Sequence, residues 1–235
     1  MIFIRSLIFL LLQIIITPVF SALALLSFPF SPHTRYRLIS QWAKLMLHLL
    51  RLVCNIRHEV RGIENIPKEP CIVLCKHQSA WETLALQKIF PPQVWVLKRE
   101  LLWIPFFGWA LALTSPIAIK RSDGKGAVKQ LLRQGKERLA QGFCVVIFPE
   151  GTRVQFGQRG KYKFGGALLA ASSGVPVVPV AHNAGRLWGR NAFSKHPGLI
   201  TMSIGAPIAT QGLKADEINT QVEAWIENEI QNLPH

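Results

Sequence analysis

Acidic side chains are scarce in this 235-residue chain, which has 13 Asp and Glu residues against 27 Lys and Arg residues. The resulting net charge of +14 argues against a basic partner and favours an anionic one: anionic lipid, a phosphorylated substrate or nucleic acid. Nucleic acid is the weaker candidate, because the sequence has no helix-turn-helix, zinc-ligand or RNP-like pattern and its basic residues accompany membrane-like segments.

Several patterns that mark reactive sites are also missing. The histidines lack the spacing of metal ligands, so no metal site is expected. No P-loop occurs, and Ser79 lacks the G-x-S-x-G elbow of a nucleophile. The four cysteines form no C-x-x-C pair, and Cys71 and Cys75 would lie about 13 Å apart on one strand, too far for a disulfide. Free thiols in a reducing compartment are the favoured interpretation.

One long apolar run is present at the amino end, over residues 2–30. Leu7–Leu26 is about as long as a bilayer core is thick, and Pro18 is expected to kink a helix there. Three interpretations stay open: a signal peptide cleaved after Ala22-Leu23-Ala24, a single span, and a hairpin or kinked anchor that dips into the membrane. Basic residues flank both ends, so we favour an uncleaved anchor on the cytoplasmic face of the inner membrane.

A second helix is predicted over Arg35–Val53, where leucines recur at three- and four-residue steps with cations between them. This pattern suits an interfacial membrane helix and, equally, a helix packed on a protein core. Residues 1–56 are therefore predicted to form a membrane-associated helical segment, and residues 57–235 a separate domain.

The second part of the chain alternates short apolar strands with helices. This alternation predicts an α/β fold with a mostly parallel sheet flanked by helices. The expected strands are Cys71–Cys75, Val94–Leu97, Ile117–Ile119, Phe143–Phe148, Val177–Val180 and Thr201–Ile204, and the expected helices are Ala80–Ile89, Gly126–Gln141, Ala167–Ser172 and Ala215–Leu233.

The most reactive patch follows the strand Cys71–Cys75. His77 would lie at the carboxyl end of this strand, where open α/β sheets place their ligands, and Glu82 in the first turn of the next helix. A carboxylate there can accept one imidazole proton and leave the other ring nitrogen to act as a general base. The alternative stays open that Ser79-x-x-Glu82 is only a capping box and His77 an ordinary loop residue.

Cations follow two other strand ends. Arg153 comes just after the strand Phe143–Phe148, and Arg121 just after Ile117–Ile119. An arginine at such a position can bind a phosphate with two hydrogen bonds, although a solvated turn is the alternative for each. Two arginines and His77 at three strand ends predict a shared pocket for a phosphorylated acceptor, with Lys163 as a weaker member.

Four blocks in this order resemble the glycerolipid acyltransferase family, most closely its lysophosphatidic acid acyltransferases. His77-x4-Glu82 resembles the family's catalytic His-x4-Asp, with Glu in place of the usual Asp. Ser115–Arg121 is similar to the second block, although Lys120 stands where an acidic or small residue often precedes the arginine. Phe148–Arg153 is a full match to the third block, Phe-Pro-Glu-Gly-Thr-Arg. Val175–Val180 resembles the fourth, an apolar segment associated with the acyl donor.

The resemblance implies acyl transfer from acyl-CoA or acyl carrier protein to the sn-2 hydroxyl of 1-acyl-glycerol-3-phosphate. It implies His77 and Glu82 as catalytic residues, no cofactor and no metal, and phosphatidic acid as the product. An acyltransferase for another lysolipid, such as a lyso-ornithine lipid, and a membrane-surface lipid hydrolase remain alternatives. With the resemblance, the residues assigned to phosphate binding are Arg121, Glu150, Gly151, Thr152 and Arg153, and Lys163 is added from its own sequence context.

Overall fold

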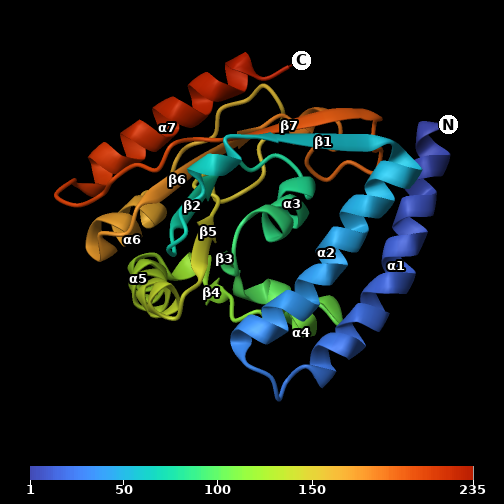
Figure 1. Cartoon of the computed structure of the whole chain (residues 1–235), viewed down its shortest axis with the longest axis horizontal. Coiled ribbons are helices and arrows are strands. Elements are labelled where there is room, and N and C mark those ends of the chain that lie inside the picture. The colour runs from blue at the N-terminus through green and yellow to red at the C-terminus, as the bar shows by residue number, and fades with distance from the viewer. Residues whose placement is uncertain (235) are drawn as a thin grey trace.

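The computed structural model describes residues 1–234, apart from the side chain of Arg121. Within this part of the chain, seven strands form one sheet with helices on both faces, as Figure 1 shows. This confirms the α/β architecture predicted from the sequence. In spatial order the strands are β1 (Ile56–Arg61), β7 (Gly198–Ile204), β6 (Val177–His182), β2 (Ile72–Cys75), β5 (Cys144–Ile147), β3 (Gln93–Lys98) and β4 (Ile117–Ile119).

The sheet is parallel except at one junction. β6 and β7 pair antiparallel, with Val180 opposite Ile204, while β1 runs parallel to β7. The connection between β6 and β7 contains only the short 3-10 helix η4 (Ala184–Arg186) and loops. A parallel neighbour needs a crossover, usually a helix, and this connection provides none, so the chain returns in the opposite direction.

Alternate residues of the central strands enter two different hydrophobic cores. On β2, Val73 and Cys75 belong to one core, and Ile72 and Leu74 to the other. Burial on both faces explains why these strands read as continuous apolar runs rather than as alternating patterns.

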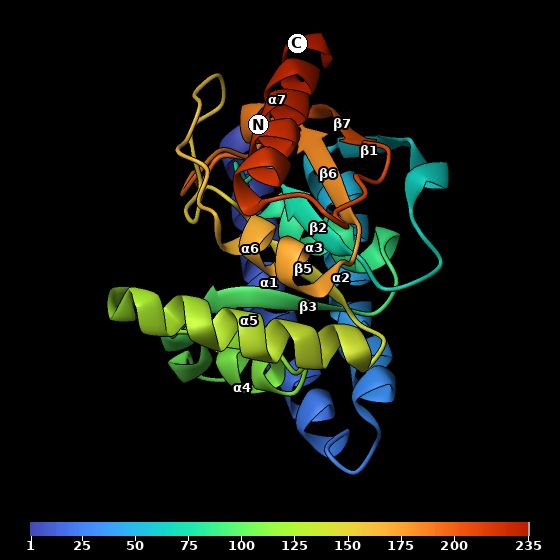
Figure 2. The ribbon, with the colours of Figure 1, turned by 90° about the vertical axis from the view of Figure 1, so that its left-hand side faces the viewer.

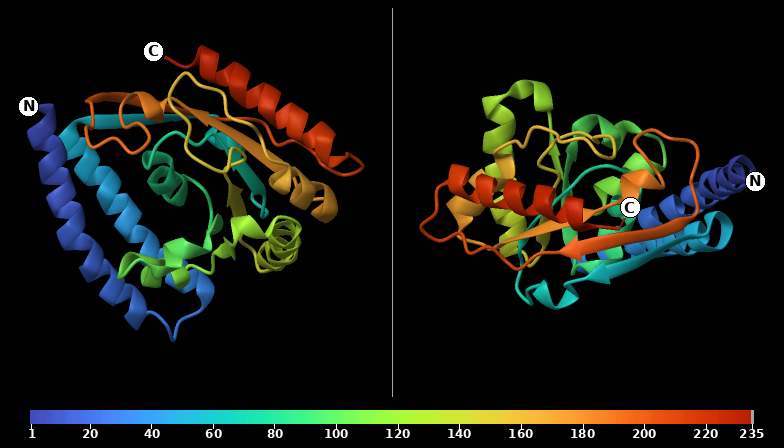
Figure 3. Two further views of the ribbon diagram at one scale, coloured as in Figure 1. Left: turned by 180° about the vertical axis from the view of Figure 1, so that it is seen from behind. Right: turned by 90° about the horizontal axis from the view of Figure 1, so that it is seen from above.

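Different helices cover the two faces. α5 (Lys125–Ala140), α6 (Gly165–Ser173) and α7 (Ala215–Asn232) lie on one face, as Figure 2 shows. α2 (Pro32–Cys54), α3 (Trp81–Ile89) and α4 (Phe107–Ala112) lie on the other. Figure 3 shows from behind and from above how the two layers enclose the sheet.

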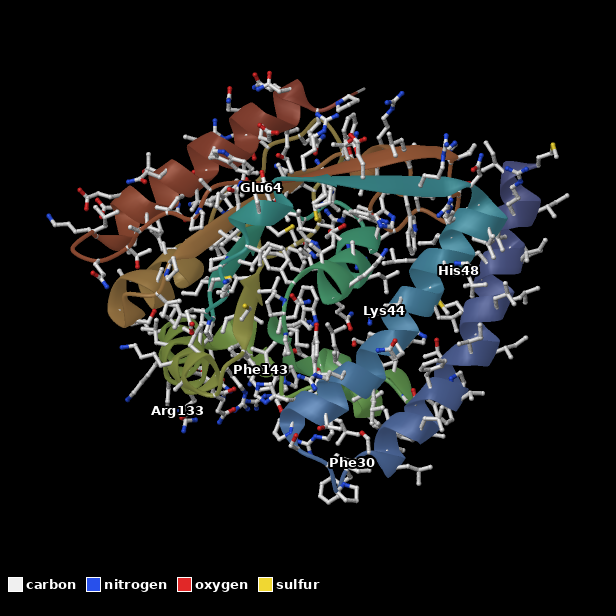
Figure 4. All side chains as sticks on the ribbon, viewed as in Figure 1. Phe30, Lys44, His48, Glu64, Arg133 and Phe143 are labelled. Atoms are coloured by element: carbon white, nitrogen blue, oxygen red, sulfur yellow. The ribbon has the colours of Figure 1, made fainter. Side chains whose placement is uncertain are left out.

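The N-terminal hairpin is formed by α1 (Ile2–Leu26) and α2, which pack side by side in Figures 1 and 3. α1 continues through Pro18, so the chain reverses at residues 27–31, and Phe30 marks this tip in Figure 4. Among the described residues, α1 is the one helix that is long and apolar enough to cross a membrane.

The second predicted helix packs on the protein core along one side. The side chains of Met46 and Leu50 of α2 are buried in the same core as Val73 of the sheet. α1 is tied to α2 by a hydrogen bond from Trp42 Nε1 to Thr17 Oγ1 at 3.3 Å, and to the loop before β7 by one from the N–H of Lys195 to Ser6 Oγ at 2.9 Å. The domain therefore holds the hairpin directly.

One strand and one α-helix of the described residues were missing from the sequence prediction. β1 carries charged residues at alternate positions, which an edge strand tolerates because it pairs only with β7. α4 has six residues, and its sequence Phe-Gly-Trp-Ala-Leu-Ala is too short and too uniformly apolar to show a helical period.

Candidate active site

The predicted pair of His77 and Glu82 is assembled at the end of β2. His77 Nδ1 lies 2.7 Å from Glu82 Oε1, and the backbone N–H groups of Gln78 and Ser79 donate to the same oxygen at 3.1 and 3.0 Å. Glu82 therefore does both things that the sequence left open: it binds the imidazole and it satisfies the turn before α3. Because a carboxylate only accepts, Nδ1 carries the proton and Nε2 is left as an acceptor.

The charge of Glu82 is stabilised although its side chain is buried. Burial acts to raise the pKa of Glu82, but the proximity of His182, the hydrogen bond from His77 and the N–H of Ser79 outweigh it. The pKa therefore lies below its ordinary value, and Glu82 is a carboxylate at neutral pH.

The ring of His77 is held by stacking on its face as well as by the hydrogen bond at Nδ1. Phe148, the residue after β5, stacks on the imidazole with the ring centroids 3.8 Å apart. The backbone of His77 is also held on both sides, since its N–H donates to Glu150 Oε2 at 2.9 Å and its carbonyl accepts from the N–H of Val154 at 2.8 Å. The block of residues 148–154 thus clamps the histidine.

Glu150 was expected among the phosphate-binding residues, and in the structure its carboxylate binds other partners. Its carboxylate is buried, with Oε1 2.7 Å from Lys76 Nζ. Lys76 is itself fully buried and also pairs with Glu227 of α7 at 2.7 Å, which in turn accepts a hydrogen bond from Tyr162 at 2.8 Å. A buried carboxylate that already binds a lysine and a backbone N–H holds the loop of His77; it would repel an anionic group.

His182 is a residue of the site that sequence reasoning missed. Its Nε2 lies 2.9 Å from the carbonyl oxygen of Lys76 and 3.8 Å from Glu82 Oε2, and its Nδ1 accepts from the N–H of Ala184. Complete burial lowers the pKa of His182, so the ring is neutral with the proton on Nε2. The available signal was its position at the end of β6, two residues after the fourth sequence block.

The side chain of Lys163 lies against the glycine turn of the third block. Gly151 has a φ of +69°, and a Cβ at this position would come within 2.7 Å of Lys163 Nζ. The N–H of Lys163 also donates to the carbonyl of Pro149 at 2.8 Å. The structure thus places the predicted residues Gly151 and Lys163 next to each other, while Thr152 lies exposed between Gly151 and Arg153.

Arg153 lines the same cavity as His77. Its Nε is buried and has no hydrogen-bond partner among the described residues, so this donor is available to a ligand. Arg121 begins the turn η3 (Arg121–Asp123) after β4, as predicted, but its side chain lies outside what the structure describes.

The cavity has a volume of about 390 Å³ and is mainly apolar. It lies between the hairpin, α3, β3 and α4, so His77 lines a space that the hairpin helps to enclose. Its apolar walls include Phe20, Ile39, Trp42, Leu84, Leu97, Leu101, Phe107 and Leu111. A polar reactive group beside an apolar cavity suits a substrate that has both a charged head and an acyl chain.

Comparison with known proteins places the chain in a family. A sequence profile of the Acyltransferase family matches residues 57–183. A 1-acyl-sn-glycerol-3-phosphate acyltransferase of Pseudomonas aeruginosa is 48% identical over 228 residues, which cover 95% of this chain and 89% of that protein. A protein of the same name from Saccharomyces cerevisiae is 31% identical over 192 residues, 79% of this chain and 63% of that protein.

A solved structure shares the fold. The crystal structure of the 1-acyl-sn-glycerophosphate (LPA) acyltransferase PlsC from Thermotoga maritima superimposes with a TM-score of 0.82 at 22% identity, and the match covers 97% of this chain and 94% of that one. Family profile, identity over nearly the whole chain and the order of the four blocks agree, and the chain belongs to the acyltransferase family that includes the 1-acyl-sn-glycerol-3-phosphate acyltransferases.

Proposed function

We propose that this protein transfers an acyl group from acyl-CoA or acyl carrier protein to the sn-2 hydroxyl of 1-acyl-glycerol-3-phosphate. The product is phosphatidic acid, an intermediate of phospholipid biosynthesis. The activity in the name of the relative at 48% identity supports this assignment. The observation that carries it is the 2.7 Å contact of His77 with Glu82 on the wall of a cavity that Arg153 also lines.

In the mechanism that follows, His77 Nε2 removes the proton of the acceptor hydroxyl. The hydroxyl oxygen attacks the thioester carbonyl carbon, the C–S bond breaks, and the leaving thiolate takes the proton back from the imidazolium. Glu82 stabilises the imidazolium that forms between these two proton transfers, and the clamp on the backbone of His77 keeps the ring in place.

The transfer needs no acyl-enzyme. Ser79 Oγ is buried and accepts a hydrogen bond from the N–H of Trp81, so it is a capping group. Burial raises the pKa of the Cys75 thiol well above its ordinary value, which removes the thiolate that a nucleophile needs.

The acceptor phosphate is assigned to Arg153, Lys163, the turn at Gly151 and Thr152, and Arg121. Binding energy from this non-reacting group would position the hydroxyl at His77. The apolar cavity would take an acyl chain, and the hairpin of α1 and α2 would anchor the protein on the cytoplasmic face of the inner membrane. A basic surface facing anionic lipid agrees with the net charge of +14.

The test is a panel of acceptors and donors incubated with the purified full chain, with products identified by mass spectrometry. We expect phosphatidic acid from lysophosphatidic acid with acyl-CoA, with acyl carrier protein, or with both. Transfer only to a non-phosphorylated lysolipid, such as a lyso-ornithine lipid, would contradict the acceptor assignment. Release of free fatty acid without any acceptor would indicate a hydrolase instead.

A further inference from the structure

A group of large apolar side chains lies exposed on the segment that joins β3 to β4. Trp103 is 71% exposed, Phe106 48%, Trp109 45% and Ile104 44%. These four residues, called the aromatic patch below, lie within seven positions on η2 (Arg99–Trp103), α4 and the turn between them. Single exposed apolar residues are ordinary, but a contiguous exposed cluster marks an interaction surface.

The backbone presents this patch in a fixed conformation. Phe106 has a φ of +61°, a region that residues other than glycine rarely adopt. Gly108 fits so closely against η2 that a Cβ there would come within 2.6 Å of the carbonyl oxygens of Leu101 and Leu102. The rings of Phe106 and Trp109 are 5.3 Å apart. A tight turn that holds aromatic side chains outward is difficult to explain by the core alone.

The patch adjoins the apolar hairpin. α4 packs against α1, and the ring of Phe107 contacts Trp42 of α2. Figures 1 and 3 show α4 beside the half of the hairpin that ends at the tip, where Phe28 is 69% and Phe30 54% exposed. The exposed apolar surface of α1 and its tip thus continues near the aromatic patch.

The inner side of the same segment lines the cavity of the active site. Leu101, Phe107 and Leu111 face the cavity, while the aromatic patch lies on the exposed side. Next to the patch, Lys98 and Arg99 are exposed, with Lys98 also 3.6 Å from Glu100. Tryptophan beside exposed cations is the composition found where a protein meets the headgroup region of an anionic bilayer.

We propose that the aromatic patch is a second membrane-contact surface, which inserts into the leaflet that the hairpin occupies. Its occupant is the interfacial region of a lipid bilayer. Two contacts, at α1 and at the patch, fix the orientation of the domain and place a cavity wall against the lipid that supplies the acceptor. The idea of a lipid acceptor comes from the proposed function, but contact with the membrane is measurable without any turnover.

The first test measures tryptophan fluorescence of the full chain with vesicles of phosphatidylethanolamine and phosphatidylglycerol that contain a brominated-chain phosphatidylcholine. Bromine quenches tryptophans that reach the acyl region. In the variant W103F/W109F we expect the quenched fraction to fall by roughly half, because most other tryptophans are enclosed in the fold. W225F on α7 is the control and should quench like the wild type. Equal quenching of all three proteins would overturn the proposal.

The second test compares two forms of the acceptor. W103S/W109S should lose about tenfold in rate on lysophosphatidic acid in vesicles, and less than about twofold on a short-chain acceptor dissolved as monomers. Ile63→Ser is the matched control, since Ile63 is 58% exposed on η1 (Ile63–Asn65), far from α4 next to the labelled Glu64 in Figure 4. An equal loss on both acceptors would overturn the proposal, because it would indicate damage to the site.

A further outcome would assign the patch to another occupant. Sedimentation in the absence of lipid should give the same mass for the wild type and W103S/W109S. A wild-type dimer that dissociates in the variant would show that a second copy covers the patch, which overturns the membrane assignment. If the wild type fails to acylate any lysolipid, the proposed function fails while the fluorescence result still decides this proposal.

Discussion

The imidazole of His182 lies 3.8 Å from Oε2 of Glu82, the oxygen that His77 does not use. Among the described residues, Oε2 has no hydrogen-bond partner, whereas Oε1 accepts three hydrogen bonds. The buried carboxylate is thus held through one oxygen and faces a neutral ring with the other. In the proposed mechanism a positive charge develops on His77, and Glu82 holds its hydrogen-bonded oxygen toward that ring.

Replacement of the proposed general base should remove most of the activity. His77→Ala is expected to lower kcat by roughly two to four orders of magnitude, the usual contribution of a general base. Steady-state kinetics with lysophosphatidic acid and an acyl donor measure this, and thermal unfolding shows that the variant is folded. Activity within about tenfold of the wild type would exclude His77 from this role.

The proposed phosphate contact should appear in the Michaelis constant of the acceptor. Arg153→Ala removes a guanidinium at the cavity and is expected to raise KM about tenfold or more, because a charged hydrogen bond contributes about 1.5–3 kcal/mol. Arg159→Ala is the matched control, since Arg159 lies on the surface and pairs with Glu223. Identical acceptor KM values for the two variants would argue against a phosphate contact at Arg153.

The buried lysine behind the active site should matter for stability. Lys76→Ala leaves the carboxylates of Glu150 and Glu227 without their shared cation, which should lower the free energy of unfolding by about 3–5 kcal/mol. Urea denaturation in a fixed detergent measures the difference. The exposed Lys161→Ala serves as the control and should change stability by less than about 0.5 kcal/mol. If Lys76→Ala lowers stability no more than the control, the two carboxylates do not depend on Lys76 for their stability in the fold.

The lowered pKa values of His182 and Glu82, both buried, predict that acid destabilises the fold. The pKa of His182 is lowered in the folded protein. Just below its ordinary value of 6.5, His182 is therefore protonated in the unfolded chain and still neutral in the folded chain. The pKa of Glu82 is also lowered, so its contribution is present above its ordinary value of 4.5 and is lost as the pH falls through the folded pKa. Both effects reduce stability as the pH decreases.

The variant His182→Gln separates the first effect from the second. Urea unfolding between pH 7 and pH 5 should show a shallower decrease in stability than the wild type, by up to about 1.4 kcal/mol per pH unit. The variant will also be less stable at pH 7, because the hydrogen bond to the carbonyl of Lys76 is weakened. Parallel pH curves would mean that His182 takes no part in the acid response.

Local patterns predicted much of this molecule because the relevant partners are close in the chain. His77 and Glu82 are five residues apart, on either side of one turn, so a strand end followed by a helix start was enough to bring them together. The same holds for the six predicted strands and four predicted helices in the domain, whose apolar runs need no distant partner to be recognised.

The residues that escaped prediction depend on distant contacts. His182 meets the carbonyl of Lys76 from 106 positions away, and Glu150 meets the N–H of His77 from 73. No periodicity or short motif encodes such pairs. The sequence likewise did not show that the carboxylate of Glu150 pairs with Lys76, because its place in the third block does not determine which way its side chain turns.

The pairing of Lys76 with Glu227 also bears on how the protein is made. The two residues are 151 positions apart, so a ribosome must add most of α7 before the lysine in the loop of His77 receives this partner. A nascent chain released earlier carries His77 and Glu82 but leaves the ammonium group short of one counter-charge in a dry interior. A chain that ends before α7 therefore contains both residues of the proposed catalytic pair but lacks one of the contacts that hold their loop.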